Sequence, residues 1–163
     1  MPDDVEDLIF RSIDRAASGV IAGLRDLEPQ PGHQVAHYRI VERLGAGGMG
    51  VVFKAEDTRL GRFVALKFLH PLAADDEAGR SQIAREARAA SALNHRSICT
   101  VHDVDLLHSP AFIVMELLEG ETLKDRLSRG PVPESAALNL ALAVASALGA
   151  AHERDLVHCD IKP

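Results

Sequence analysis

The spacing of apolar residues changes along the chain, and each spacing predicts a different kind of element. From Val5 to Leu27 apolar residues recur every three or four positions, which is typical of an amphipathic helix. The acidic residues in its first turn complement the helix dipole. Prolines and a glycine within residues 28–32 break the helix and predict a linker. Two interpretations of this leader stay open: a docking or dimerising helix, or a solvated extension that rests on the domain.

A second pattern begins at Tyr38, where short β-branched and aromatic runs are separated by glycine-containing turns. Such runs are typical of an antiparallel meander. Thr122, with Asp125 three residues later, resembles a capping box that opens a short helix. The predicted elements are strands at 38–44, 51–55 and 63–69, a helix at 81–93, strands near 100–106 and 111–117, a helix at 122–129 and a long helix at about 133–154.

Length, charge and composition exclude several classes of protein. The 163 residues suit one domain, and 47% hydrophobic with 26% charged residues exclude a wholly disordered chain. The net charge of −6 argues against a general nucleic-acid or anionic-membrane binder. Cys99 and Cys159 form no CxxC pair, so a reducing compartment is the default and neither a disulfide framework nor a zinc site is expected. His33 and His37 are four apart, but Pro31-Gly32 argues against the helix that a metal pair would need.

The N-terminus and the long apolar stretch bear on the cell compartment. The first residues lack the basic region of a secretory signal. The nearly apolar run at 136–151 is shorter than the roughly 20 residues that span a bilayer, and we interpret it as a buried helix. We therefore expect a cytoplasmic protein with no membrane segment in this chain.

Residues 45–52 (GAGGMGVV) fit the pattern G-x-G-x-x-G-x-V. Glycines are needed where backbone amides come close to phosphate oxygens, because a Cβ would block the approach. Dinucleotide-binding folds and kinases share the first six positions. A dinucleotide fold needs a helix that opens at Gly50, whereas the following Val51-Val52-Phe53 is strand-like. We therefore predict a β-hairpin that covers phosphates; the alternative is a glycine-rich hairpin with no ligand.

Lys67 ends the third predicted strand in an otherwise apolar run. Strand alternation places Val64 and Leu66 on one face and Ala65 with Lys67 on the other. A small alanine beside a lysine leaves room for a flat base whose phosphates the ammonium reaches. Glu86, on the next predicted helix, would pair with Lys67 and hold it. The alternatives are a strand-end lysine that reaches solvent and a solvated helix glutamate.

The last residues, 158–163 (HCDIKP), complete a resemblance to a known family. Together with the glycine loop, Lys67 and Glu86 in this order, they resemble the protein kinases. Residues 114–120 (VMELLEG) resemble the hinge between the two kinase lobes, with Met115 as gatekeeper. The stretch 38–69 is most similar to bacterial serine/threonine protein kinases.

The resemblance implies an α+β fold with a definite domain organisation. Residues 38–163 would form a partial kinase domain, and residues 1–37 the N-terminal helix and linker. Within the domain, 38–118 would be the small lobe and hinge, with a five-stranded antiparallel sheet and one helix. Residues 119–163 would be the first helices of the large lobe.

The resemblance also implies a role for each matching residue. Lys67 would hold the α- and β-phosphates of ATP, oriented by Glu86. Asp160 would accept the proton of the substrate hydroxyl, and Lys162, a mark of serine/threonine specificity, would neutralise the transferred phosphoryl group. His158 would be a buried packing residue. The implied ATP-binding residues are Leu44, Gly45, Ala46, Gly47, Gly48, Met49, Gly50, Val52, Ala65, Lys67, Glu86, Met115, Glu116 and Leu118.

The chain departs from the family pattern at Cys159 and at its end. Cys159 stands where most family members carry an arginine that binds a phosphate on the activation loop, which suggests activity not gated by that phosphorylation. Cys159 is either a buried inert cysteine or a reactive thiol. The family's Mg²⁺-binding Asn and DFG segment would lie beyond Pro163, so no metal ligand is assigned here. We expect a partial chain, inactive alone, whose long C-terminal helix lacks neighbours.

The function implied is an ATP-dependent serine/threonine protein kinase, with ATP and Mg²⁺ as cofactors and a protein substrate that the sequence does not identify. The alternative is a non-catalytic nucleotide-binding or regulatory interaction module. A dinucleotide-binding dehydrogenase is disfavoured by the strand after Gly50.

Overall fold

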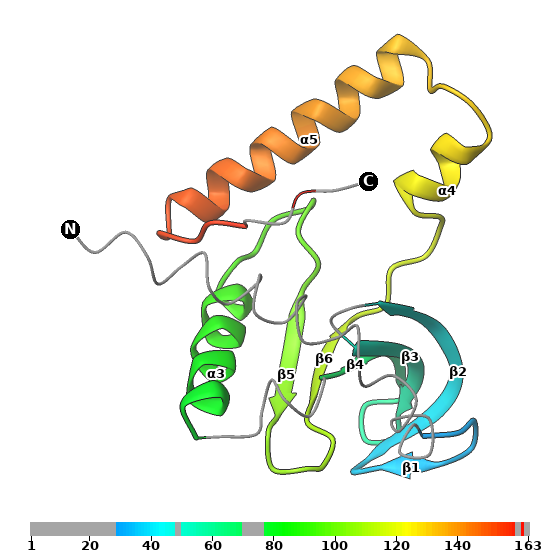
Figure 1. Ribbon diagram of the computed structural model, residues 1–163, viewed down its shortest axis with the longest axis vertical. Coiled ribbons are helices and arrows are strands. Elements are labelled where there is room, and N and C mark those ends of the chain that lie inside the picture. The colour runs from blue at the N-terminus through cyan, green and yellow to red at the C-terminus, as the bar shows by residue number, and fades with distance from the viewer. Residues whose placement is uncertain (1–28, 48–49, 70–76, 159–160, 162–163) are drawn as a thin grey trace.

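The structure, a computed structural model, describes residues 29–47, 50–69, 77–158 and 161. Its largest part is a six-stranded antiparallel sheet with strand order β1-β2-β3-β4-β6-β5 (Figure 1). Helix α3 packs against β5, while α4 and α5 follow β6. The α+β class is as predicted, and the leader helix at 5–27 lies outside the described residues. The elements are β1 (Gln34–Val35), β2 (Tyr38–Gly47), β3 (Gly50–Asp57), β4 (Arg62–Phe68), α3 (Glu77–Ser91), β5 (Val101–Asp105), β6 (Phe112–Glu116), α4 (Leu123–Ser128) and α5 (Glu134–His152).

One face of the sheet forms the hydrophobic core. Alternation along β4 buries Val64 and Leu66 completely, as the sequence predicts. Aromatic rings pack edge to face or tilted within the core, with Phe68 5.7 Å from Phe53 and 5.5 Å from Phe112 between ring centroids. The core residues are Tyr38, Ile40, Phe53, Ala55, Val64, Leu66, Phe68, Phe112 and Val114. The opposite face of β3 and β4 is therefore left for the site.

The sheet has six strands, not five, because part of the expected linker pairs with β2. Ala36 adopts a left-handed φ of 52°, which turns the chain back so that β1 runs antiparallel to β2. Beyond this pair, the Gly32 N–H donates to the Ile40 carbonyl and the Ile40 N–H to the His33 carbonyl, both at 2.9 Å. The described residues just before Tyr38 are thus bonded to the sheet rather than forming a separate linker.

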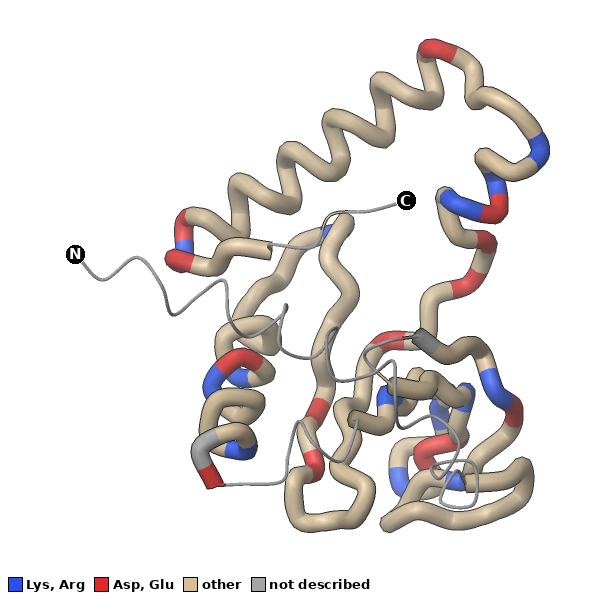
Figure 2. The backbone as a smooth tube through the Cα atoms, in the orientation of Figure 1, with Lys and Arg blue, Asp and Glu red and all other residues tan. Residues whose placement is uncertain are grey.

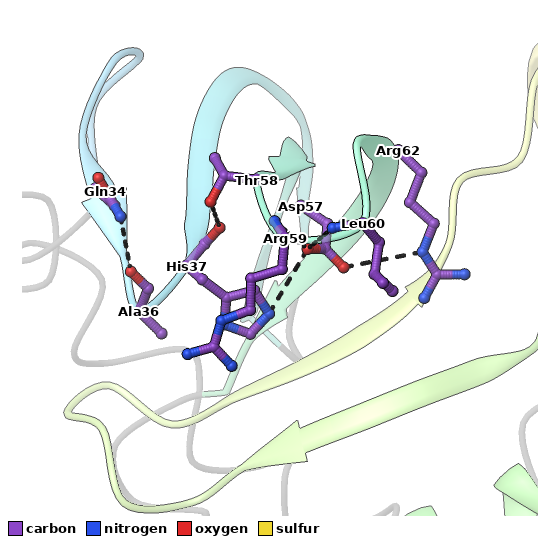
Figure 3. A network of polar contacts seen from close by, with 8 residues as sticks. All are labelled: Gln34, Ala36, His37, Asp57, Thr58, Arg59, Leu60 and Arg62. Carbon is purple, nitrogen blue, oxygen red and sulfur yellow. Dashed lines mark hydrogen bonds and ion pairs between the residues drawn. The ribbon is translucent and has the colours of Figure 1, made fainter.

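Asp57, at the end of β3, is a buried carboxylate that organises the turn into β4 (Figure 3). Its Oδ1 accepts the backbone N–H groups of Arg59 and Leu60 at 3.0 and 3.1 Å. Two basic side chains face the carboxylate. Arg62 Nε lies 3.9 Å from Asp57 Oδ2, and His37 Nε2, which is a cation only when its ring is protonated, lies 3.7 Å from Asp57 Oδ1. Asp57 therefore links the β1–β2 turn, the β3–β4 turn and the start of β4, which a sequence motif alone did not indicate.

Helix α4 begins as predicted. The Thr122 hydroxyl oxygen accepts the Asp125 N–H at 3.0 Å, and the same hydroxyl donates to the Asp125 carboxylate at 2.6 Å. This differs from a full capping box, in which the carboxylate would accept the N-cap backbone N–H.

Helix α5 is apolar along its length, with charged residues only near its ends (Figure 2). None of its residues is buried, and Leu138, Leu140, Leu142 and Val144 are exposed. The interpretation of this segment as a buried helix is therefore wrong for the part of the chain that the structure describes. Helix α5 is also long and apolar enough to span a membrane, but core helices of folded domains often have the same length and composition.

Candidate functional site

The glycine segment forms the tip of a β-hairpin. Strands β2 and β3 pair as far as Gly47 opposite Gly50, and Gly48 and Met49 lie outside the described residues. Strand β3 begins directly at Gly50, so no helix opens there. This confirms the strand predicted after Gly50 and removes the geometry that a dinucleotide-binding loop requires.

Gly45 and Gly50 of this hairpin are surrounded differently. Gly50 has φ +121°, and a Cβ built on it would lie 2.0 Å from the Phe68 carbonyl oxygen. Gly50 is therefore required by the close approach of β4. A Cβ on Gly45 would meet nothing within 4 Å, so open space lies next to its backbone. Of the two, Gly45 is the one whose missing side chain leaves room for a ligand.

Strand register brings the expected nucleotide-binding side chains onto one face of the sheet. Val52 is paired with Gly45 on β2 and with Lys67 on β4. Ala65 is two residues before Lys67 and is paired with Met115 on β6. Directly paired residues of antiparallel strands project from the same face. Val52, Ala65, Lys67 and Met115 thus form a continuous patch opposite the core. The alternation in β4 predicted this face for Ala65 and Lys67.

A second lysine on the same face is held by other groups. Lys54 is paired with Ala65, and its Nζ lies 3.7 Å from Glu42 Oε1 and 4.8 Å from the centroid of the Phe63 ring. The carboxylate and the ring thus both engage this ammonium. Lys54 is therefore a natural control for experiments on Lys67.

Leu44 lies where β2 departs from regular pairing. Two irregularities interrupt the β2–β3 register, between Ile40 and Glu42 and between Arg43 and Gly45. Leu44 falls in the second and is 48% exposed, next to the Gly45 backbone. Bulges of this kind redirect side chains near functional sites. Leu44 is thus available to contact a ligand held under the hairpin.

The proposed hinge begins at the last residue of β6. The Glu116 N–H donates to the Thr100 carbonyl at 2.9 Å, and its carboxylate accepts the Thr100 N–H at 3.3 Å. Leu118, two residues further, is 65% exposed. Glu116, the first residue of the proposed hinge, is thereby bonded to the residue just before β5, while Leu118 is accessible.

Cys99 lies against this hinge, a position that the sequence analysis did not single out. Its Sγ approaches the Glu116 carbonyl oxygen at 3.7 Å. Burial raises the pKa of the Cys99 thiol, and the Glu116 carboxylate raises it further. Cys99 is therefore a neutral thiol at neutral pH. A carbonyl oxygen has two lone pairs, so the Glu116 carbonyl retains acceptor capacity for a ligand.

Glu86 lies half-buried on α3, where its Oε1 accepts a hydrogen bond from Gln82 Nε2 at 2.8 Å. Helix α3 packs on β5, the edge strand of the sheet that pairs with β6. Lys67 lies half-buried on β4. Their mutual pairing stays a prediction.

The catalytic segment follows α5. The chain leaves the helix through Asp155, which has a left-handed φ of 58°, and the Leu156 N–H returns to the Ala151 carbonyl at 3.1 Å. His158 is exposed, so the expectation that it is buried is wrong here, because α5 before it buries no residue. Asp160 and Lys162 lie outside the described residues.

Comparison with known proteins explains why these features occur together. The model of the protein kinase domain matches residues 38–163. The chain belongs to the protein kinase family. Among curated kinases, it is 37% identical over 141 residues to the serine/threonine-protein kinase PknD of Mycobacterium tuberculosis, and 40% identical over 127 residues to PrkC of Bacillus subtilis. These alignments cover 86% and 77% of this chain, but only 21% and 20% of the two relatives.

The kinase fold is also shown by solved structures. The crystal structure of the Mycobacterium tuberculosis PknI kinase domain matches with a TM-score of 0.75 and 31% identity, over 83% of this chain and 55% of that one. The six-stranded sheet and α3 correspond to a kinase small lobe, which confirms the fold class expected from the sequence. The family is that of bacterial serine/threonine kinases related to those of eukaryotes.

Proposed function

We propose that this chain is the ATP-binding part of a serine/threonine protein kinase, which transfers the γ-phosphoryl group of ATP to protein hydroxyl groups. The observation that carries the proposal is the shared face of Val52, Ala65 and Lys67, beneath a hairpin whose Gly45 leaves open space. The curated relatives, named as serine/threonine-protein kinases, support it.

The residues present fit ATP in size and charge. Val52 and the small Ala65 offer an apolar surface for the adenine, and Met115 borders it. Backbone groups at Glu116 and Leu118, which follow β6, would bond the adenine edge. Lys67 would place its ammonium against the α- and β-phosphates, and the hairpin amides near Gly45 would cover them.

The catalytic step needs groups from the segment after α5. Asp160 would accept the proton of the substrate hydroxyl as its oxygen attacks, and Lys162 would stabilise the charge on the transferred phosphoryl group. Mg²⁺ would neutralise the phosphates when bound. No group of three or more metal-ligating side chains occurs in the part of the chain that the structure describes.

Nucleotide binding tests the proposal directly. Charge-assisted hydrogen bonds contribute about 1.5–3 kcal/mol, so Lys67→Met should weaken ATP binding by about 10- to 100-fold in calorimetric titration. The matched control is Lys54→Met on the same face, which removes a lysine engaged by Glu42 and Phe63 and should leave ATP affinity unchanged. Equal ATP affinity of wild type and Lys67→Met would refute the assigned site.

Transfer of labelled phosphate to a generic protein substrate distinguishes the kinase from the alternative. Transfer that Asp160→Asn abolishes would support phosphoryl transfer by this chain. ATP binding that depends on Lys67, without transfer, would favour the non-catalytic nucleotide-binding module.

A further inference from the structure

Helix α3 carries basic side chains on the side that points away from β5 (Figure 2). Arg85 and Arg88 are both exposed, and at a spacing of three they are neighbours on the helix surface. Burial at Ile83 and Ala87 marks the other side of the helix, which packs against β5. Arg85 and Arg88 therefore form a basic patch on the outer side of the helix, which we call the arginine face.

Neither residue of the arginine face forms an ion pair with a carboxylate in the part of the chain that the structure describes. Arg85 donates to the side-chain oxygen of Gln82, which is a neutral group. Glu77, the acidic residue of the first turn, lies eight residues before Arg85, about 12 Å along the helix. Two like charges at a spacing of three repel each other, so a segment rich in carboxylates would stabilise this face.

The leader, residues 1–28, has the complementary charge. It lies outside the described residues, and its sequence contains seven acidic and three basic side chains. It therefore contributes −4 to the net charge of −6 of the whole chain. Its acidic residues are densest at the start, where four of the five residues 3–7 (DDVED) are Asp or Glu.

The length of the leader matches the distance that it would have to cross. The β1–β2 pair and the bond from the Gly32 N–H to the Ile40 carbonyl fix the chain just after the leader at the β1 edge of the sheet. Strand β5 lies five strand spacings away, about 24 Å, and α3 packs about 10 Å beyond it. The apolar repeat from Val5 to Leu27 predicts a helix of 23 residues, about 34 Å long. Such a helix brings residues 3–7 to α3.

We propose that the acidic start of the leader, residues 3–7, docks on the arginine face of α3. The contact makes the leader a docking helix of its own chain rather than a solvated extension. It rests on charge, exposure and length, and it goes beyond the proposed function because it does not require ATP.

Spin-label distance measurements on the full chain test the docking. Labels are attached at Pro2→Cys and Ser91→Cys, the latter at the exposed end of α3, after both native cysteines have been replaced by serine. The chain should show one short, narrow distance at low salt. The distribution should broaden as the ionic strength rises, because salt screens exposed charge pairs.

Charge reversal on the arginine face should release the leader. An exposed ion pair shifts an equilibrium by about 1.4- to 5-fold, and Arg85→Glu with Arg88→Glu removes two such pairs and adds repulsion. The ratio of docked to free leader should therefore fall by about 5- to 30-fold. The matched control is Arg59→Glu with Lys124→Glu, which changes the net charge equally at exposed positions outside α3 and should leave the distance unchanged.

Reversal of both partners separates docking from damage to the fold. Lysine at all four acidic positions of residues 3–7 should restore the short distance in the chain that carries Arg85→Glu and Arg88→Glu. Equal urea midpoints of these chains, followed by circular dichroism, show that the fold is kept. A broad distribution in the parent chain, or a short distance that survives reversal of the arginines alone, would overturn the proposal.

Two further measurements identify the occupant. A short distance in a mixture of singly labelled chains would place the leader of a second copy on the arginine face and would overturn docking within one chain. A distance that is independent of protein concentration supports docking within the chain. ATP titration of the same variants tests the proposed function separately, since a chain that binds no ATP can still dock its leader.

Discussion

Substitution of Gly50 by alanine tests the claim that this glycine serves packing rather than ligand binding. An alanine Cβ would lie 2.0 Å from the Phe68 carbonyl oxygen and 3.2 Å from its carbonyl carbon. Ordinary contact begins near 3.4 Å, so β3 and β4 must separate by more than an ångström at the pair Val51–Phe68. Both clashing atoms belong to backbone, so no side-chain rotation relieves the contact.

The cost can be worked out from two terms. A residue with a side chain at φ +121° carries strain of about 1–3 kcal/mol. Loss of a backbone hydrogen bond at the separated strand ends costs about 1 kcal/mol more. Gly50→Ala should therefore reduce the free energy of unfolding by about 2–4 kcal/mol, a large share of the about 5–15 kcal/mol typical of a domain.

Urea unfolding followed by circular dichroism measures this change, since the chain has no tryptophan and a single tyrosine. Gly45→Ala is the contrasting variant. Open space surrounds its Cβ position, so the free energy of unfolding of Gly45→Ala should equal that of wild type or exceed it by up to about 1 kcal/mol. ATP binding should weaken, because the added methyl group lies on the side where the ligand would bind. A Gly50→Ala protein within about 0.5 kcal/mol of wild type would refute the packing argument.

Two further predictions concern Asp57 and Cys99. Asp57→Ala should lower the free energy of unfolding by about 3 kcal/mol, because it leaves the Arg59 and Leu60 N–H groups and a facing arginine without their acceptor; Asp57→Asn, which keeps one acceptor oxygen, should cost less in the same urea titration. The pKa of the Cys99 thiol is raised above the unfolded value of 9.0. The neutral thiol therefore contributes its full share of the folding stability below pH 9.0. That share is lost as the pH rises from there through the raised pKa of the folded state. In a Cys159→Ser background, iodoacetamide should alkylate native Cys99 more slowly than the unfolded chain at about pH 8–9, and Glu116→Gln should accelerate the reaction; equal rates would contradict the proposed environment.

The strands of the small lobe were predictable because their burial alternates with a clear period. Val64 and Leu66 face the core, while Ala65 and Lys67 face away, as a period of two requires. The antiparallel register of neighbouring strands then carried this assignment from β4 to Val52 and Met115. Sequence reasoning therefore reached Ala65 and Lys67 by alternation, whereas Val52 and Met115 were assigned through the family resemblance, and only the register showed that all four share a face.

The sixth strand was missed because its signal is not local. Gln34 and Val35 show no alternation, and Pro31-Gly32 just before them is typical of a linker. Their pairing depends on the left-handed backbone of Ala36, a conformation that favours glycine and gives no signal at alanine.

Two polar contacts were missed for different reasons. Asp57 at the end of a strand, followed by a turn that contains Gly61, is a usual setting for an Asx turn, and this signal could have indicated the carboxylate's bonds to Arg59 and Leu60. The bond between His95 and Ser146 joins residues 51 apart in the chain, and no periodic pattern relates them.

The position of β6 in the sheet has a mechanical consequence. This strand runs directly into the hinge, and it is bonded to β4 along one edge and to β5 along the other. Rotation of β6 would have to break two ladders at once, so the strand is a rigid support up to Glu116. Any swing of α4 and α5 relative to the sheet would therefore be concentrated in residues 117–122, and the end of β6 that we propose faces the adenine would keep its place in the sheet.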